Sequence, residues 1–266
     1  MQKLIIRSAL ITTLMLLIWI GLNHILDESI WEGMTLSKSA LTVEYCEFNN
    51  PHKFFHQSMN TYSNLVYFFL GVLICQIAWE DSNHRNFQNR LANFPLLSAL
   101  MGFCFIYLSF GSAFFHASLT WAGQRVDMNG TYSITLTLVS IGLYHVLHKI
   151  NLSERAKKIW IGVMLVIILA FYQIHLLISS NILVPVLILL MLILIGINYF
   201  QFPKKRYLIF GILSLVLIAI AIKIRAMDVQ KINCDPYSPY QGHSVWHLLA
   251  GLSSFCNYAF FRFWKK

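Results

Sequence analysis

The chain has 266 residues, of which 57% are hydrophobic and 12% charged, and its mean hydropathy is +0.61. This composition excludes a single soluble core, and the long apolar runs are typical of an all-α, multi-pass membrane protein. The net charge of +9 comes mainly from lysines and arginines that flank the apolar runs. No basic face interleaved with aromatic residues indicates a nucleic-acid partner.

The first segment, residues 1–22, is predicted to be a transmembrane helix or an uncleaved signal-like anchor. Lys3 and Arg7 precede or begin its apolar run, and the residues that follow contain no small-x-small cleavage site. After it we expect an outer loop with an acidic motif at 23–58, a seven-helix domain at 59–262 and a short cytoplasmic tail at 263–266.

Eight apolar segments are long enough to cross a bilayer, since about 20 helical residues span its hydrocarbon core. They cover residues 4–22, 59–79, 95–117, 125–147, 158–178, 182–201, 207–226 and 242–262. The apolar tract from 159 to 200 is too long for one span. We predict that one helix ends and the next begins at Ser179, Ser180 and Asn181, just before Pro185.

The basic residues predict the orientation in the membrane. Of the 20 lysines and arginines, 14 lie on the side that holds both termini and six on the other side. Lysine and arginine in short loops stay in the cytoplasm, so both termini are expected there. In this topology His116, Asp127, His243 and His247 all lie at the outer face of the membrane.

Three of these residues are candidate metal ligands. His243 and His247 are four residues apart and share one helical face, and His116 ends a helix that runs to the same side. Three imidazoles leave the fourth position of a tetrahedral zinc ion open to water, whose pKa then falls to about 7. Membrane histidines also hydrogen-bond between helices without any metal, and this alternative stays open.

Two further side chains fit such a hydrolytic site. The carboxylate of Asp127 could orient the water and carry its proton to the leaving group. Ser112 lies one turn before His116, where its hydroxyl could hydrogen-bond the water or a developing oxyanion. Because both residues are near helix ends, they could instead act as helix caps.

The five cysteines show no C-x-x-C motif. Cys75, Cys104 and Cys256 lie within predicted spans and are interpreted as packing residues. Cys46 and Cys234 lie in outer loops, so we predict a disulfide between them.

Four stretches of the chain resemble the alkaline ceramidases, seven-helix membrane hydrolases related to the adiponectin and progestin receptors and to GPI-lipid remodelling proteins. The stretches occur in the family's order and read EYCEFN, NTYSNL, GSAFFHASLTWAGQRVD and CDPYSPYQGHSVWHLL. The likeness spans roughly residues 44–262 and leaves the first helix without a counterpart. It implies zinc on His116, His243 and His247, with Ser112 and Asp127 beside it.

The resemblance also implies a reaction: hydrolysis of the amide of a ceramide-like lipid, which enters laterally from the bilayer, to a long-chain base and a fatty acid. The membrane would be the plasma membrane of a prokaryote, or the endoplasmic reticulum or Golgi of a eukaryote. The residues themselves imply a metal and water, but they do not identify the bond that is cleaved.

A calcium site is a further implication of the resemblance. Its ligands would be Glu44, Tyr45, Glu47, Asn49 and Gln57. Gln57 stands where the family has a glutamate, so this site would carry one negative charge less. The alternative is a solvated acidic loop.

Other functions remain open at this point. A lipid hydrolase that cuts an ester or phosphodiester would share the metal site, and a receptor of the same fold would keep zinc as a structural ion. A haem electron carrier would also place histidines in helices, but it would give Ser112 and Asp127 no task.

Overall fold

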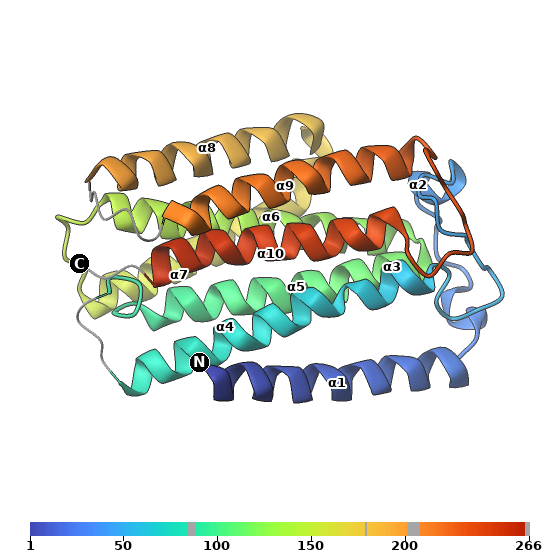
Figure 1. The fold of residues 1–266 in the computed structure, drawn as a ribbon, viewed down its shortest axis with the longest axis horizontal. Helices are drawn as coiled ribbons and strands as arrows, with labels where there is room; N and C mark the ends of the chain where they lie inside the picture. Colours follow the sequence, from blue (N-terminus) through green and yellow to red (C-terminus); the bar gives the residue numbers. More distant parts are fainter. Residues whose placement is uncertain (85–88, 179, 202–207, 264–266) are drawn as a thin grey trace.

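The computed structural model describes residues 1–84, 89–178, 180–201 and 208–263. Helices joined by loops make up this part of the chain, and no strand occurs in it (Figure 1). The elements are α1 (Gln2–Ile25), a 3-10 turn η1 (Glu28–Trp31), α2 (Lys38–Leu41), α3 (Ser58–Ser63), α4 (Leu65–Asn83), α5 (Pro95–Ser118), α6 (Trp121–Val146), α7 (Glu154–Leu177), α8 (Ser180–Gln201), α9 (Leu208–Val229) and α10 (Gly242–Arg262). The predicted all-α fold is confirmed.

Eight long helical segments, with α3 and α4 counted as one, lie where the eight spans were predicted. Among the described residues, six of them are long and apolar enough to cross a membrane: Gln2–Ile25, Ser58–Asn83, Pro95–Ser118, Glu154–Ile174, Ile182–Gln201 and Leu208–Val229. α6 and α10 are of similar length but more polar. The predicted break in the long apolar tract lies between α7 and α8, and Ser179 itself is outside the described residues.

The bundle has two distinct ends. α1 begins and α10 ends at one of them, and α2, α3 and the loops before α10 gather at the other (Figure 1). α5 packs between α4 and α6, and α9 packs along α10. The cytoplasmic location of the termini remains a prediction from the charge distribution.

α4 and α5 approach each other closely at two glycines. A Cβ atom on Gly102 would lie 2.4 Å from Cys75 Sγ and 2.9 Å from the carbonyl oxygen of Gly71. A Cβ on Gly71 would lie 2.8 Å from the carbonyl oxygen of Gly102. Only glycine fits at this crossing, and the contact holds α5 directly against α4.

The end of the bundle that holds the chain termini is fixed by two arginines. The guanidinium of Arg90 donates hydrogen bonds to four carbonyl oxygens where α6 ends, those of Tyr144, Leu147, His148 and Ile150. It thereby satisfies acceptors that the helix end leaves unpaired.

The second arginine joins α10 to α4. Arg262 Nε donates to Asp81 Oδ2 at 2.8 Å, and Arg262 Nη2 pairs with Asp81 Oδ1. The side chains are only 14% and 6% exposed. This pair locates the far end of the helix whose other end carries His243 and His247.

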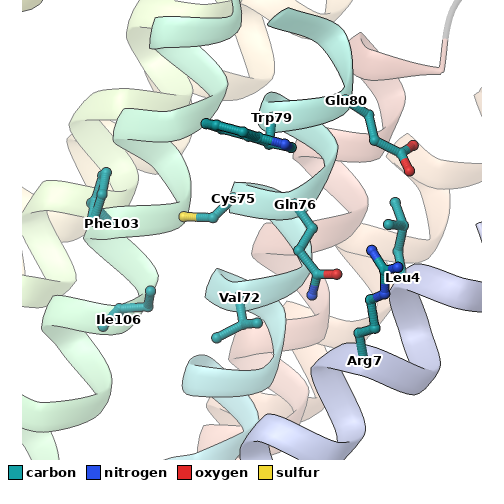
Figure 2. Close-up of a pocket in the computed structure, with 9 residues that line it drawn as sticks. All are labelled: Leu4, Arg7, Val72, Cys75, Gln76, Trp79, Glu80, Phe103 and Ile106. Atoms are coloured by element: carbon teal, nitrogen blue, oxygen red, sulfur yellow. The ribbon is translucent and has the colours of Figure 1, made fainter. Parts of the chain in front are cut away.

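α1 packs mainly on α4. Gln76 Nε2 donates to Ser8 Oγ at 2.8 Å, and Trp19 is buried in T-shaped contact with the rings of Phe55 and Phe110. A largely apolar groove of about 330 Å³ lies between α1, α4 and α5, with Arg7 at its edge (Figure 2). It is near the chain start, away from the predicted metal ligands.

Candidate metal centre

A tight connection between α5 and α6 brings His116 and Asp127 to the same end of the bundle. α5 ends at Ser118 because Leu119 adopts a left-handed conformation with φ of 52°. The Thr120 side chain then accepts a hydrogen bond from the Gly123 N–H at 3.1 Å and starts α6.

The start of α10 is held by Asp228, near the end of α9. Asp228 Oδ1 accepts from the His243 N–H and Oδ2 from the Cys46 N–H, both at 3.2 Å. A Cβ on Gly242 would lie 2.8 Å from Asp228 Oδ1, so glycine is required for this approach. One buried carboxylate therefore positions the first histidine of α10 and the acidic loop together.

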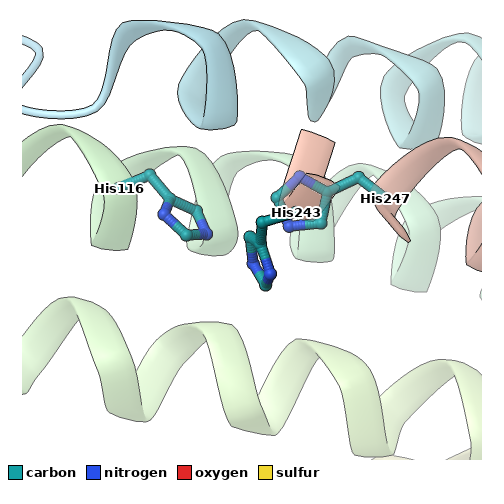
Figure 3. Close-up of side chains that lie close together, drawn as sticks. All are labelled: His116, His243 and His247. Carbon is teal, nitrogen blue, oxygen red and sulfur yellow. The ribbon is translucent and has the colours of Figure 1, made fainter. Parts of the chain in front are cut away.

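The three predicted ligands converge (Figure 3). His116 on α5 meets His243 and His247 on α10, and one nitrogen from each lies within 4.8 Å of the others. The three side chains are 0%, 4% and 3% exposed. A buried cluster of three imidazoles at this spacing could hold a metal ion.

Partner side chains orient two of the imidazoles. Gln57 Oε1 accepts from His116 Nδ1–H at 2.7 Å, because an amide oxygen can only accept. Ser63 gives its own proton to the Asn60 carbonyl at 2.8 Å, so its Oγ accepts from His247 Nδ1–H at 2.7 Å. Both histidines therefore present an unprotonated Nε2 to the cluster.

Two ring nitrogens in the cluster have no hydrogen-bond partner among the described residues, namely His116 Nε2 and His243 Nδ1. Buried imidazole nitrogens are ordinarily paired, so unpaired ones in a cluster of histidines are consistent with ligands of an ion.

Ser63 and Gln57 were not expected from the sequence as partners of the histidines. The predicted span at 59–79 is in fact two helices, α3 and α4, which meet at Asn64. The Ser63 hydroxyl and the Asn64 amide both donate to the Asn60 carbonyl at 2.8 Å, the acceptor that the backbone of residue 64 would use in a continuous helix. The signal was the polar run NTYSNL at the start of an apolar span.

Ser112 lies one turn before His116 on α5, and Asp127 lies near the start of α6. Ser112 is 1% exposed, and its Oγ has no hydrogen-bond partner in the described part of the chain. Asp127 is half-buried and lies close enough to interact with Ser112 and with Arg225, although no hydrogen bond of standard geometry joins it to Ser112.

Arg225, on α9, is a further polar residue of this region that the sequence analysis did not single out. Its Nη2 lies 3.4 Å from Glu44 Oε1, and its guanidinium lies 5.8 Å from the ring centre of Trp246. An arginine inside an apolar span was the signal, since such a charge is costly in a membrane unless it has a partner.

A family model described as Ceramidase matches residues 37–265, which is most of the chain. The chain belongs to the ceramidase family. No curated protein and no solved structure matches it. The family implies hydrolysis of the amide bond of ceramide, and α1 lies before the matched residues.

The acidic loop contacts the histidines through Tyr45. The ring of Tyr45 is 4.0 Å from that of His243 and 5.4 Å from that of His116, measured between ring centres. Tyr45 is 7% exposed, and burial raises the pKa of its hydroxyl. The loop therefore covers the cluster from the end of the bundle opposite the chain termini (Figure 1).

Glu47 caps α3. Its Oε1 accepts from the Met59 N–H at 2.6 Å and its Oε2 from the Asn60 N–H at 2.8 Å. Burial raises the pKa of Glu47 to about 7, although both backbone donors favour the charged carboxylate. The remaining residues implied for calcium are also bonded within the chain: Gln57 Nε2 donates to Asn49 Oδ1 at 2.6 Å, and the Lys231 ammonium donates to the Tyr45 carbonyl.

A disulfide joins Cys46 to Cys234, with their Cα atoms 5.7 Å apart. The Phe48 N–H also donates to the Pro236 carbonyl at 3.0 Å. The acidic loop is thus attached to the loop that leads into α10. The other three cysteines are free.

Proposed function

We propose that the chain is a zinc-dependent lipid amidase that cleaves the amide of a ceramide-like lipid into a long-chain base and a fatty acid. Membership of the ceramidase family supports the amide substrate. The observation that carries the proposal is the meeting of three buried histidines from α5 and α10. Two of them have Nδ1 engaged elsewhere, which leaves Nε2 for an ion.

The donor set fits zinc. Neutral imidazole nitrogens are preferred zinc ligands, and three of them are typical of catalytic sites. Zinc held in this way supplies an activated water molecule for attack on a carbonyl carbon.

Asp127 and Ser112 have separate roles in this proposal. The Asp127 carboxylate accepts the proton of the attacking water at Oδ and returns it to the amide nitrogen, which leaves as the amine of the long-chain base. The unpaired Ser112 hydroxyl donates to the carbonyl oxygen as negative charge develops on it. The lipid reaches the site from the bilayer, so its acyl chain stays in the hydrocarbon layer during the reaction.

Metal analysis combined with a ceramide assay tests the site. His247→Ala should lose zinc and activity together. The matched control is His145→Ala, which removes another buried membrane histidine whose Nδ1 is bonded to the Ile141 carbonyl. The control should keep its zinc. Wild-type protein without zinc, or full activity in His247→Ala, would contradict the proposal.

A second experiment separates an enzyme from a protein with structural zinc. Asp127→Asn should keep the zinc and lose about 10²–10⁴-fold in kcat, the usual contribution of a general acid-base group. Unchanged kcat would exclude this role for Asp127. Ester analogues of ceramide, with oxygen in place of the amide nitrogen, test which bond is cleaved. If each ester is turned over faster than its matching ceramide, a lipid esterase is favoured.

We also propose that both termini face the cytoplasm and that the histidines lie at the outer face. The excess of basic residues on the side of the termini supports this orientation. A reporter that works only in the cytoplasm should be active when it is fused to the C-terminus. Activity of a reporter that works only in the periplasm or lumen would contradict this orientation.

A further inference from the structure

Each of the five residues that the family resemblance assigns to calcium already has an oxygen engaged by a protein group. Calcium takes six to eight oxygen ligands, which come from carboxylates, carbonyls and water. In this chain, oxygens of all five residues accept hydrogen bonds or ion pairs from protein groups. The chemistry of each donor decides whether the residue could serve an ion instead.

Gln57 has become a link between the acidic loop and a histidine. Its Nε2 points at Asn49 Oδ1, at 2.6 Å, and an amide N–H cannot bind a cation. Its Oε1 accepts from His116 Nδ1 at 2.7 Å and from Asn60 Nδ2 at 3.1 Å. A glutamate at this position would offer a negative charge and two oxygens. The glutamine has no charge and a single side-chain oxygen, and its N–H group also engages Asn49 Oδ1.

The Glu47 carboxylate is bonded to the backbone. Both carboxylate oxygens accept N–H groups at the start of α3, and the side chain is buried at 6% exposure. If the carboxylate turned to bind an ion, these two N–H groups would lose their acceptors and would need new ones.

Two cations of the chain reach the remaining oxygens. The Lys231 ammonium donates to the Tyr45 carbonyl, and Arg225 Nη2 lies 3.4 Å from Glu44 Oε1. Lys231 lies in the turn after α9 at a φ of 59°, a conformation that few residues other than glycine adopt. Three residues later Cys234 is bonded to Cys46, so the turn that carries the lysine is attached to the loop that carries the carbonyl.

We propose that this chain holds its outer loop without calcium, with Lys231 and Arg225 supplying the positive charge and the Gln57 amide supplying the bridge to His116. The loop then stays closed over the histidines, with Tyr45 against His243, at any calcium concentration. This inference does not depend on which metal the histidines hold.

Thermal unfolding of the full-length protein in detergent tests the proposal. With saturating zinc in both samples, the melting temperature, Tm, should be the same in calcium-free buffer and in millimolar calcium. A protein saturated far above its Kd would instead gain roughly 5 °C or more. Equilibrium dialysis with radioactive calcium should find no stoichiometric binding. A calcium-dependent rise of that size, or about one calcium per chain, would overturn the proposal.

Variants test the replacement groups. Lys231→Met should lower Tm by a few degrees in calcium-free buffer with saturating zinc, because the Tyr45 carbonyl loses a charged donor. The control is Lys223→Met, since Lys223 is exposed on α9 and makes no hydrogen bond or ion pair with the described residues. Equal Tm values for both variants would refute the role of Lys231.

The double variant Gln57→Glu, Lys231→Met restores a carboxylate and removes a cation. It should acquire a Tm that rises with calcium. If the double variant folds but its Tm does not respond to calcium, Gln57 and Lys231 do not replace the ion, and the proposal is wrong.

Discussion

Ser63 is predicted to set the affinity of the histidine cluster for zinc without touching the ion. Its hydroxyl lies between the Asn60 carbonyl, to which it donates, and His247 Nδ1, from which it accepts. In Ser63→Ala the Nδ1–H of His247 loses its acceptor. The imidazole can then turn, or it can move its proton to Nε2, which removes the lone pair that would bind the metal.

Two independent estimates give the size of this effect. A donor left unpaired at a site that is 3% exposed costs about 1–3 kcal/mol. Loss of a hydrogen-bond partner behind a metal-binding histidine typically lowers metal affinity about 10–100-fold, which equals about 1.4–2.7 kcal/mol. We therefore expect the affinity for zinc to fall about 10–100-fold.

Competition with a chromophoric zinc chelator measures this affinity directly. The kcat of Ser63→Ala in excess zinc should stay near that of the wild type, because Ser112 and Asp127 are unchanged. Ser109→Ala is the matched control: Ser109 Oγ donates to the Asn64 carbonyl at 2.8 Å and makes no hydrogen bond to a histidine among the described residues. Zinc affinity of Ser63→Ala within about twofold of the wild type, or an equal loss in Ser109→Ala, would refute the reasoning.

Three further predictions concern the framework of the site. Gly102→Ala should destabilise the protein by about 1–3 kcal/mol through its clash with α4, whereas Gly162→Ala, where no atom lies within 4 Å of the added Cβ, should be neutral or slightly stabilising in the same Tm measurement; equal losses would contradict the close approach. Arg262→Met leaves Asp81 buried and unpaired, so unfolding free energy should fall by about 3–5 kcal/mol, and adding Asp81→Asn should recover part of it in a double-mutant cycle, with strict additivity as the contrary result. Reduction of the disulfide between the outer loops should lower the free energy of unfolding by about 2–4 kcal/mol, and an unchanged Tm under reductant would exclude that contribution.

The amino-acid sequence by itself determined the class of the fold and the order of its helices. In a bilayer, the backbone polar groups of a long apolar run are satisfied when the run forms a helix. The lengths of these runs therefore predicted the helical segments that the structure forms. Chain order and helix direction then placed His116 and the α10 pair at one end, since alternate helices of a bundle run in opposite directions. The spacing of His243 and His247 identified the pair because residues four apart share a helical face.

Tertiary structure alone decided which side chains support the histidines. Ser63 and His247 are 184 positions apart, His116 and Gln57 are 59 apart, and Lys231 and Tyr45 are 186 apart. No local periodicity relates such positions, because their contacts depend on helix rotation and on the glycine crossing of α4 and α5. The resemblance of the acidic loop to a calcium motif was visible in the residue types. That its oxygens are taken by Gln57, Lys231 and backbone N–H groups followed only from where the folded chain brings these donors.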